Sequence, residues 1–278
     1  MTNFLNYQPN FLLVRPIFSP EEKDRLRRLA DEYPLRRLLE NPRAFQESSI
    51  EYTFVSSKIE GNSYTLKDTA DLLKYGFTTG SKPFNDALMI KNINQAFEEI
   101  CTRKHTFYPV LSKPFLCGVH QTVCHDLMSR ERCGKVREEP VSIQGSCYLP
   151  LAGAPLLEGE LDNLLKYASS IENVFERAVY VHLNLAYLQY FLDGNKRTAR
   201  LMQTAVLTEA GCTPLLLKDN DIIEYQHSVV DYYETGRYNA YANLFLRGYQ
   251  NTIDVLLGRS PAQIEAQKRA EELIRMRR

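Results

Sequence analysis

The stretch Gln189-Tyr-Phe-Leu-Asp-Gly-Asn-Lys-Arg-Thr-Ala-Arg200 decides how this chain folds and where its chemistry lies. It follows an apolar segment of helical spacing, Val174 to Leu188, and opens a second helix expected from about Lys196 to Ala210, ended by Gly211. A Gly-Asn pair has little side-chain bulk, so backbone N–H groups of the turn and of the following helix can converge on an anion. The pattern predicts a phosphate site between two helices.

The charged residues of this stretch suit a polyphosphate. Arg197 and Arg200 are three positions apart, so we expect both guanidinium groups on one face of the helix's first turn, beside the same anion. Asp193 precedes the glycine and can hold Mg²⁺ on the phosphates, because hard cations prefer carboxylate and phosphate oxygens. Gly194, Asn195 and Lys196 complete the predicted binding residues.

Taken together, these residues resemble the signature of the Fic (Fic/Doc) family, His-Pro-Phe-x-[Asp/Glu]-Gly-Asn-[Gly/Lys]-Arg-x-x-Arg. The matching positions are Phe191, Asp193, Gly194, Asn195, Lys196, Arg197 and Arg200. The resemblance implies a mainly α-helical Fic fold with a small β-hairpin flap. It also implies ATP and Mg²⁺ as ligands, and transfer of AMP from ATP to a hydroxyl side chain of a target protein.

Two positions depart from the signature, because Gln189 and Tyr190 stand where the family has His and Pro. The family's histidine takes the proton from the attacking hydroxyl, which an amide cannot do near neutral pH. A positioned base contributes about 10²- to 10⁴-fold, so we expect nucleotide binding to persist while transfer is slow. His182 lies about two helical turns from Gln189, too far to replace the base, and His227 cannot be placed from sequence. Tyr190 could offer a hydroxyl.

A second stretch, Ser56-Ser-Lys-Ile-Glu60-Gly61, resembles the inhibitory motif [Ser/Thr]-x-x-x-Glu-[Gly/Asn] of many Fic proteins, with Ser56, Glu60 and Gly61 matching. In the family this glutamate reaches the second arginine of the signature, here Arg200, and occupies the space of the γ-phosphate. A carboxylate and a phosphate would compete for one set of donors. The alternative is that Glu60 is a helix-end surface carboxylate and Gly61 the helix stop.

The spacing of apolar residues changes from helical to about two between Gly134 and Pro150. Val141 and Ile143 would share one face of a strand, and Gly145 would form a turn, which predicts a hairpin at about 136–150. In Fic proteins a hairpin at this position, the flap, aligns a segment of the target protein by backbone pairing. A purely structural hairpin is the alternative.

The resemblance also divides the chain. We expect an N-terminal helical region at 1–110 with the inhibitory motif, a Fic core domain at 111–257 and a charged C-terminal helix at 258–278. Tyr225 and Tyr233 lie where family members contact adenine, although tyrosines at helical spacing are more often packing residues.

Composition narrows the function classes. A hydrophobic content of 44% supports a sizeable core, and 34 basic residues balance 34 acidic ones, so nucleic acid and anionic membranes are not expected partners. The N-terminus lacks a cationic region followed by an apolar one, and no apolar run approaches the roughly 20 residues that span a bilayer. We therefore expect a cytoplasmic protein. The sequence leaves a homo-oligomer open.

The six cysteines include no Cys-x-x-Cys pair, which favours reduced thiols. His120 and Cys124 are four positions apart on an expected helix at 114–131, so a zinc site with Cys117 and His125 is conceivable. Buried cysteines and a core histidine explain the same spacing.

Three functions fit these patterns. The first is a Fic-type protein adenylyltransferase, inhibited in cis by Glu60 and impaired by Gln189, whose target docks on the flap. The second is a catalytically inactive ATP-binding signalling module. The third is a Doc-type phosphotransferase, which Arg200 disfavours because Doc-like proteins generally lack the second arginine.

Overall fold

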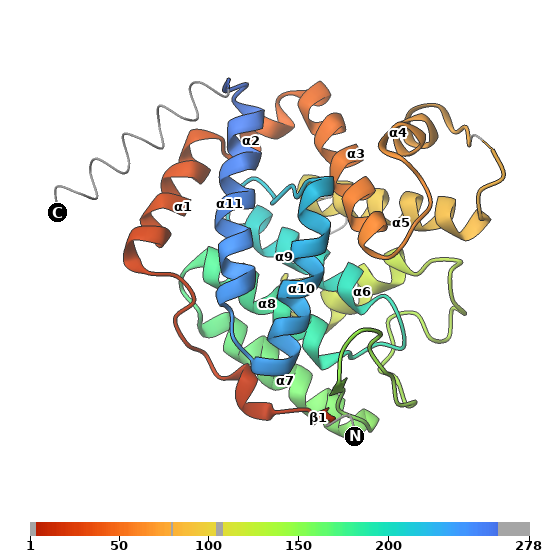
Figure 1. The fold of residues 1–278 in the computed structure, drawn as a ribbon, viewed down its shortest axis with the longest axis vertical. Coiled ribbons are helices and arrows are strands. Elements are labelled where there is room, and N and C mark those ends of the chain that lie inside the picture. Colours follow the sequence, from red (N-terminus) through yellow and green to blue (C-terminus); the bar gives the residue numbers. More distant parts are fainter. Residues whose placement is uncertain (1–3, 79, 104–107, 261–278) are drawn as a thin grey trace.

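The structure is a computed structural model that describes residues 4–78, 80–103 and 108–260, and these fold mainly into α-helices (Figure 1). The first helices are α1 (Pro20–Glu32), α2 (Leu35–Leu39), α3 (Pro42–Ile59), α4 (Leu66–Tyr75), α5 (Phe84–Thr102) and α6 (Lys113–Val123). The others are α7 (Ala154–Ser170), α8 (Val174–Leu188), α9 (Asn195–Glu209), α10 (Ile222–Thr235) and α11 (Asn239–Leu256), with 3₁₀ turns η1 (Pro9–Leu12) and η2 (Asp219–Asp221). The mainly α prediction is confirmed. From residue 261 on, the predicted C-terminal helix lies outside the described residues.

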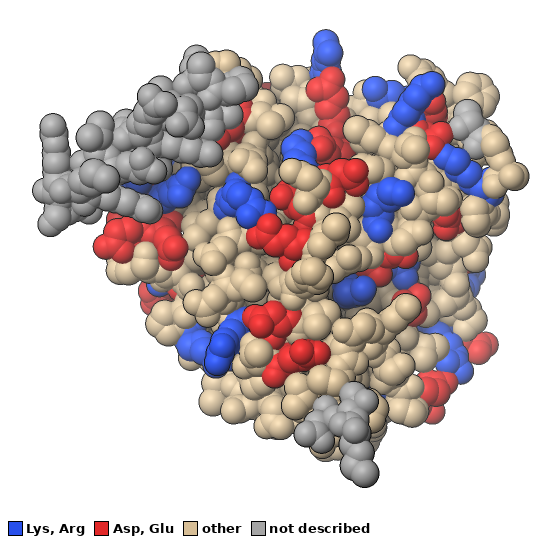
Figure 2. Space-filling model, in the orientation of Figure 1, with Lys and Arg blue, Asp and Glu red and all other residues tan. Residues whose placement is uncertain are grey.

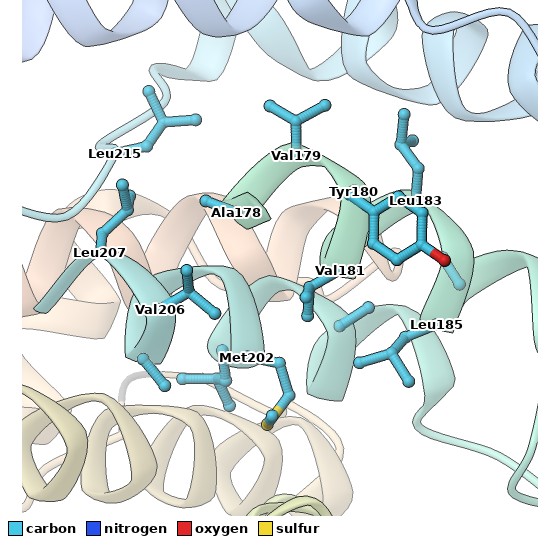
Figure 3. Packing of buried hydrophobic residues seen from close by; sticks show 14 of the residues in the cluster. Ala178, Val179, Tyr180, Val181, Leu183, Leu185, Met202, Val206, Leu207 and Leu215 are labelled. Atoms are coloured by element: carbon cyan, nitrogen blue, oxygen red, sulfur yellow. The ribbon is translucent and has the colours of Figure 1, made fainter. Parts of the chain in front are cut away.

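Helices α8 and α9 form the centre of the core. Helix α8 is mostly apolar and is buried from Phe175 to its end except at the partly exposed Arg177, as expected for a helix covered nearly all round. Apolar side chains of α8 and α9, among them Val181 and Met202, fill the space between these helices and their neighbours (Figure 3). In Figure 1, α1 and α11 flank this pair on one side, and α3 and α5 lie on the other.

The helix ends follow local sequence signals. Helix α1 begins with a capping box in which the Ser19 hydroxyl and the Glu22 carboxylate exchange hydrogen bonds with each other's backbone. Helix α4 begins with the same arrangement between Thr65 and Asp68. At the end of α9, Gly211 has φ +77°, and the N–H groups of Gly211 and Cys212 donate to carbonyls of the last helical turn. The predicted glycine stop is therefore confirmed.

Helix α6 ends earlier than predicted, at Val123 rather than near residue 131. The amide of Asn92 donates to the carbonyls of Val123 and His125, at 3.3 and 2.7 Å, and so satisfies acceptors that a longer helix would have used. Asp126 then adopts a left-handed conformation with φ +57°, and the chain leaves the helical path. Tertiary hydrogen bonds from α5 therefore set this end.

The predicted hairpin is not formed by paired strands. The strands found in the described ranges are β1 (Leu5–Asn6) and β2 (Tyr148–Leu149), which pair in parallel. The turn at Gly145 is present, with φ +82°. Its neighbours bond elsewhere, because the Ser146 hydroxyl and the Cys147 N–H donate to the carboxylate of Glu234. The segment is thus a loop held by side chains.

The surface carries charges of both signs. Lys and Arg side chains are interspersed with Asp and Glu over the face drawn in Figure 2, without a broad area of one sign. Arg247, for example, donates to both Asp221 and Glu224. A search of the described residues finds no helix with the length and apolar character that a membrane span requires.

Candidate functional site

The predicted phosphate turn, residues 189–194, connects α8 to α9 and is closed by Asn195. The Asn195 side-chain oxygen accepts from the Phe191 N–H at 2.8 Å, while its amide donates to the Phe191 carbonyl at 2.7 Å and to Gln189 Oε1 at 3.1 Å. Gln189 itself adopts a left-handed conformation with φ +50° and ψ +52°. Asn195 therefore shapes the turn through its side chain.

Position 194 requires glycine, because its backbone conformation disfavours other residues and because neighbouring atoms leave no room for a Cβ. Gly194 has φ +74°, and a Cβ atom there would lie 2.6 Å from Cys124 Sγ and 3.4 Å from His120 Nε2. Gly194 is also the N-cap of α9, which has no side-chain cap. The first N–H groups of α9 therefore remain available to an anion.

His120 supports the turn through hydrogen bonds and ring stacking, a role that the sequence did not indicate. Its Nδ1 accepts from the Gly134 N–H at 2.8 Å, and its Nε2–H donates to the Asp193 carbonyl at 2.9 Å. The ring stacks on Phe191 with centroids 3.7 Å apart. Burial lowers the pKa of His120 to about 4, so the ring is neutral near pH 7.

Both ring nitrogens of His120 are engaged in these hydrogen bonds, so neither is free to bind a zinc ion. Across the described ranges, no group of three or more His, Cys, Asp and Glu side chains is arranged to hold a metal ion. Burial also raises the pKa of the Cys124 thiol to about 12, which keeps it protonated. His120 and Cys124 are therefore described by the alternative to a zinc site, a core histidine beside a buried cysteine.

An open cavity of about 730 Å³ lies beside the turn, bounded by the end of α3, by α10 and by the loop residues Val141–Gly145. A cavity of this size accommodates a small organic ligand. Predicted site residues that line it are Glu60, Gly61, Gln189, Asp193, Gly194, Asn195, Lys196, Tyr225 and Tyr233. Ser56, Arg197 and Arg200 lie behind this lining.

Arg197 carries unused hydrogen-bond donors. Its side chain is 5% exposed, and Nη2 donates to Asp193 Oδ2 at 2.9 Å. Its Nε and Nη1 are buried without a hydrogen-bond partner among the described residues. Leaving a buried donor unsatisfied costs about 1–3 kcal/mol, and more for a charged group. An anion would reach these two donors only if the turn or the Arg197 side chain moved, because Arg197 does not line the cavity.

Arg200 contacts Glu60, as the resemblance to the inhibitory motif implied. All of its guanidinium nitrogens have partners in this arrangement, and its predicted place beside the same anion as Arg197 stays a prediction. The Nε of Arg200 donates to Ser56 Oγ at 2.9 Å, and its Nη1 to the Tyr225 hydroxyl at 3.1 Å. Its Nη2 donates to the Ser56 carbonyl at 3.0 Å and to Glu60 Oε1 at 2.9 Å.

The Glu60 carboxylate sits among three cations. Lys196 Nζ is 3.6 Å from Glu60 Oε2, on the side opposite Arg200. Burial alone would raise the pKa of Glu60, but the charges of Arg200, Lys196 and Arg197 outweigh it and lower that pKa. Glu60 is therefore ionised near neutral pH, and its side chain is only 16% exposed. These contacts argue against a surface carboxylate.

The remaining candidates occupy distinct positions. His182 is fully buried and contacts the Tyr225 hydroxyl at 3.3 Å, and burial with the charge of Arg200 lowers its pKa to about 3. His227 lines the cavity from α10. Tyr190 is 1% exposed and does not line the cavity, so its hydroxyl is not presented there.

Part of this chain, including the turn, is similar to known proteins. Residues 110–207, which contain the turn and most of α9, match the family model described as Fic/DOC family. This segment is similar to Fic/DOC domains. It includes the signature turn but ends before α10, which supplies part of the cavity wall.

Similarity to known proteins extends beyond residues 110–207. The chain is 24% identical over 234 residues to "Protein adenylyltransferase Fic" of Nematostella vectensis, covering 83% of this chain and 54% of that protein. Against a Drosophila persimilis protein of the same name, identity is 26% and the chain spans 36% of the relative. The chain thus spans about half or less of the length of these relatives.

Solved structures share the fold. Fic-1 from C. elegans superposes with a TM-score of 0.72 at 19% identity, over 86% of this chain and 71% of that one. A Fic family protein from Desulfovibrio desulfuricans G20 gives 0.73 at 16% identity, over 88% and 77%. The predicted Fic fold is therefore confirmed, although its small sheet is the parallel β1–β2 pair and not the predicted hairpin.

Proposed function

We propose that this chain is a protein adenylyltransferase that moves AMP from ATP to a hydroxyl of a target protein, and that Glu60 inhibits it in cis. The observation that carries the proposal is the start of α9, where no side chain of the described residues caps the helix and where Asn195 and Lys196 line the cavity. The backbone N–H donors of such a helix start suit the phosphates of ATP. Relatives named as protein adenylyltransferases support the same activity.

In this proposal the triphosphate lies in the turn. Its negative charge meets the first N–H groups of α9, the guanidinium group of Arg197 and the ammonium group of Lys196. The nucleoside extends along α10, where Tyr225 and Tyr233 form part of the wall. Their side chains are 1% and 2% exposed, so they would support the wall beside the base rather than stack on it.

Asp193 fits a magnesium ion that ATP would bring. Its side chain is 71% exposed, and only Oδ2 is used, by Arg197. Magnesium is commonly held by one or two carboxylates together with substrate phosphates, so a single carboxylate is sufficient. When bound, the ion would neutralise phosphate charge.

Glu60 would exclude the productive phosphate position. Its carboxylate lines the cavity, accepts from Arg200 Nη2 and lies within reach of Lys196. A phosphate oxygen at the same donors would have to displace it, because two anions repel each other in a buried site. ATP would therefore bind weakly or in a displaced pose until the end of α3 moves.

Gln189 limits the chemistry. Its Nε2 donates to the Ala186 carbonyl at 2.7 Å and its Oε1 accepts from Asn195, so the amide supports the turn and cannot take a proton. Transfer would then depend on phosphate positioning and run slowly. This substitution favours one other candidate, an ATP-binding module without transfer. In either case a target protein would approach over the loop 141–145, which lines the cavity.

The Glu60→Gly protein, incubated with Mg²⁺ and with α- or γ-labelled ATP, separates these functions. Label on protein from α only indicates AMP transfer, and label from γ only indicates phosphotransfer. Neither label, with ATP binding retained in calorimetry, indicates the binding module. Glu60→Gly/Arg197→Ala is the control and should bind no ATP; absence of binding in both proteins contradicts the proposed site.

A further inference from the structure

Arg137 is buried, with 2% of its surface exposed, and lies outside the cavity wall. Its backbone N–H donates to the Tyr190 carbonyl at 3.1 Å, and its Nε donates to the Gln189 carbonyl at 2.6 Å. On its other side, Nη1 donates to the Glu139 carbonyl at 2.8 Å and Nη2 to the Leu151 carbonyl. One residue thus joins two loops.

The first pair of bonds fixes the start of the signature turn. Gln189 has φ +50°, and a non-glycine residue in this conformation costs roughly 1–2 kcal/mol, so something must hold it there. The guanidinium of Arg137 does so through a charge-assisted bond, which is stronger than a neutral one. The direction of the Gln189 carbonyl therefore depends on Arg137.

The second pair of bonds holds the ends of the loop 139–151. Between these ends lie Val141–Gly145, which form one wall of the cavity. The backbone of Leu5 holds the later part of this loop, at Cys147 and β2, but residues 141–145 have no strand partner among the described residues, so their position depends on such side-chain bonds. A shift of the turn would move the shared guanidinium and with it both loop ends.

We propose that Arg137 is a positioning residue that couples the signature turn to the loop 139–151. Nucleotide bound at the turn restricts Gln189, Arg137 transmits this restriction to Glu139 and Leu151, and the loop becomes ordered for the target protein. The coupling is reciprocal, so an ordered loop strengthens nucleotide binding. Arg137 does this without touching the ligand.

This inference rests on the proposed nucleotide site, and its test uses the full chain with Glu60→Gly. Amide hydrogen exchange is followed at residues 148–154, which do not line the cavity and so report coupling without ligand contact. Saturating Mg-ATP should slow exchange there. Adding Arg137→Lys should abolish this slowing and weaken ATP binding about tenfold, because the donors of an ammonium lie at one point and cannot span the carbonyls that three separate guanidinium nitrogens reach.

Arg177→Lys is the matched control, because Arg177 also donates to a backbone carbonyl, that of Ile171, away from the cavity. It should leave both readouts unchanged. If Glu60→Gly binds ATP and exchange at 148–154 does not slow, or slows equally with Arg137→Lys, the coupling is wrong. If Glu60→Gly binds no ATP, the proposed function fails instead. Arg137→Gln replaces the lysine variant should that variant not fold.

Discussion

Glu60 Oε1 lies 2.9 Å from Arg200 Nη2, and this contact joins the end of α3 to the first turn of α9 across 140 positions of sequence. Arg200 keeps bonds to Ser56 and Tyr225 that do not involve Glu60. Removing one partner of a buried pair usually leaves an uncompensated charge, at a cost of about 3–5 kcal/mol. Here the retained bonds reduce that cost, so Glu60 is the removable member of the pair.

Replacing Glu60 with Gly should tighten ATP binding. The change frees one donor of Arg200 and removes the anion beside Lys196, so we expect an affinity gain of about tenfold or more in calorimetry. Glu51→Gln is the matched control, because Glu51 lies on the same helix and pairs with Lys218 outside the cavity. Equal affinities in the Glu60→Gly and unaltered proteins would reject the inhibitory role.

The sequence predicted the parts of this structure that depend on local signals. The predicted stop at Gly211 depends on backbone within a few positions and is present, and the caps at Ser19 and Thr65 are equally local. The residues near the turn could also be named, because a helix–turn–helix fixes their relative positions. Only the folded structure shows which of these residues line the cavity.

Other features depend on distant contacts and left no such signal. The alternation of Val141 and Ile143 indicated strands, but the bonds of Arg137 and Glu234 hold that segment as a loop. His120 was read correctly as a packed residue, yet nothing in its spacing pointed to the Asp193 carbonyl. A polar side chain that binds backbone atoms far away has no sequence pattern of its own.

Replacing Gln189 with His in the Glu60→Gly protein should raise transfer of the α-label to protein. An imidazole restores a proton acceptor at the turn, and a positioned base contributes about 10²- to 10⁴-fold. The left-handed backbone at this position tolerates His better than most residues. Gln189→Ala serves as the control without a base. A rate for Gln189→His no higher than that of the control would mean that the site lacks more than the base.

Stability should fall as the pH drops from 7.5 to 5. Burial lowers the pKa of His120 to about 4, and burial with Arg200 lowers that of His182 to about 3, from 6.5. Between 6.5 and these values the unfolded chain binds more protons, so acid favours unfolding. The expected loss at pH 5 is on the order of 2 kcal/mol per histidine, measured by urea unfolding.

His120→Gln should reduce that pH dependence by about half, although it lowers stability at pH 7.5. His125→Gln is its control, because His125 is exposed and lies only five positions away. The control should keep the full dependence on pH. Equal unfolding free energies of the unaltered protein at pH 5 and 7.5 would contradict the neutral, buried state of both rings.

Alanine substitutions at two glycines, one at each end of α9, distinguish the cost of backbone strain from the cost of a steric clash. Gly194 and Gly211 have φ +74° and +77°, but a Cβ at Gly194 would meet Cys124 Sγ at 2.6 Å, whereas nothing lies within 4 Å at Gly211. Gly211→Ala should therefore cost only the strain, about 1–2 kcal/mol in urea unfolding. Gly194→Ala should cost a further 1–3 kcal/mol or so, because the packed thiol must move.

The same pair tests the site as well as the fold. Moving Cys124 also disturbs His120, which holds the Asp193 carbonyl, so Gly194→Ala should weaken Mg-ATP binding to the Glu60→Gly protein. Gly211→Ala lies at the far end of the helix and should leave that affinity unchanged. Both variants are measured by calorimetry under conditions where each remains folded. Equal destabilisation and equal affinities would mean that the turn accepts a side chain at position 194, and that its close packing does not shape the phosphate site.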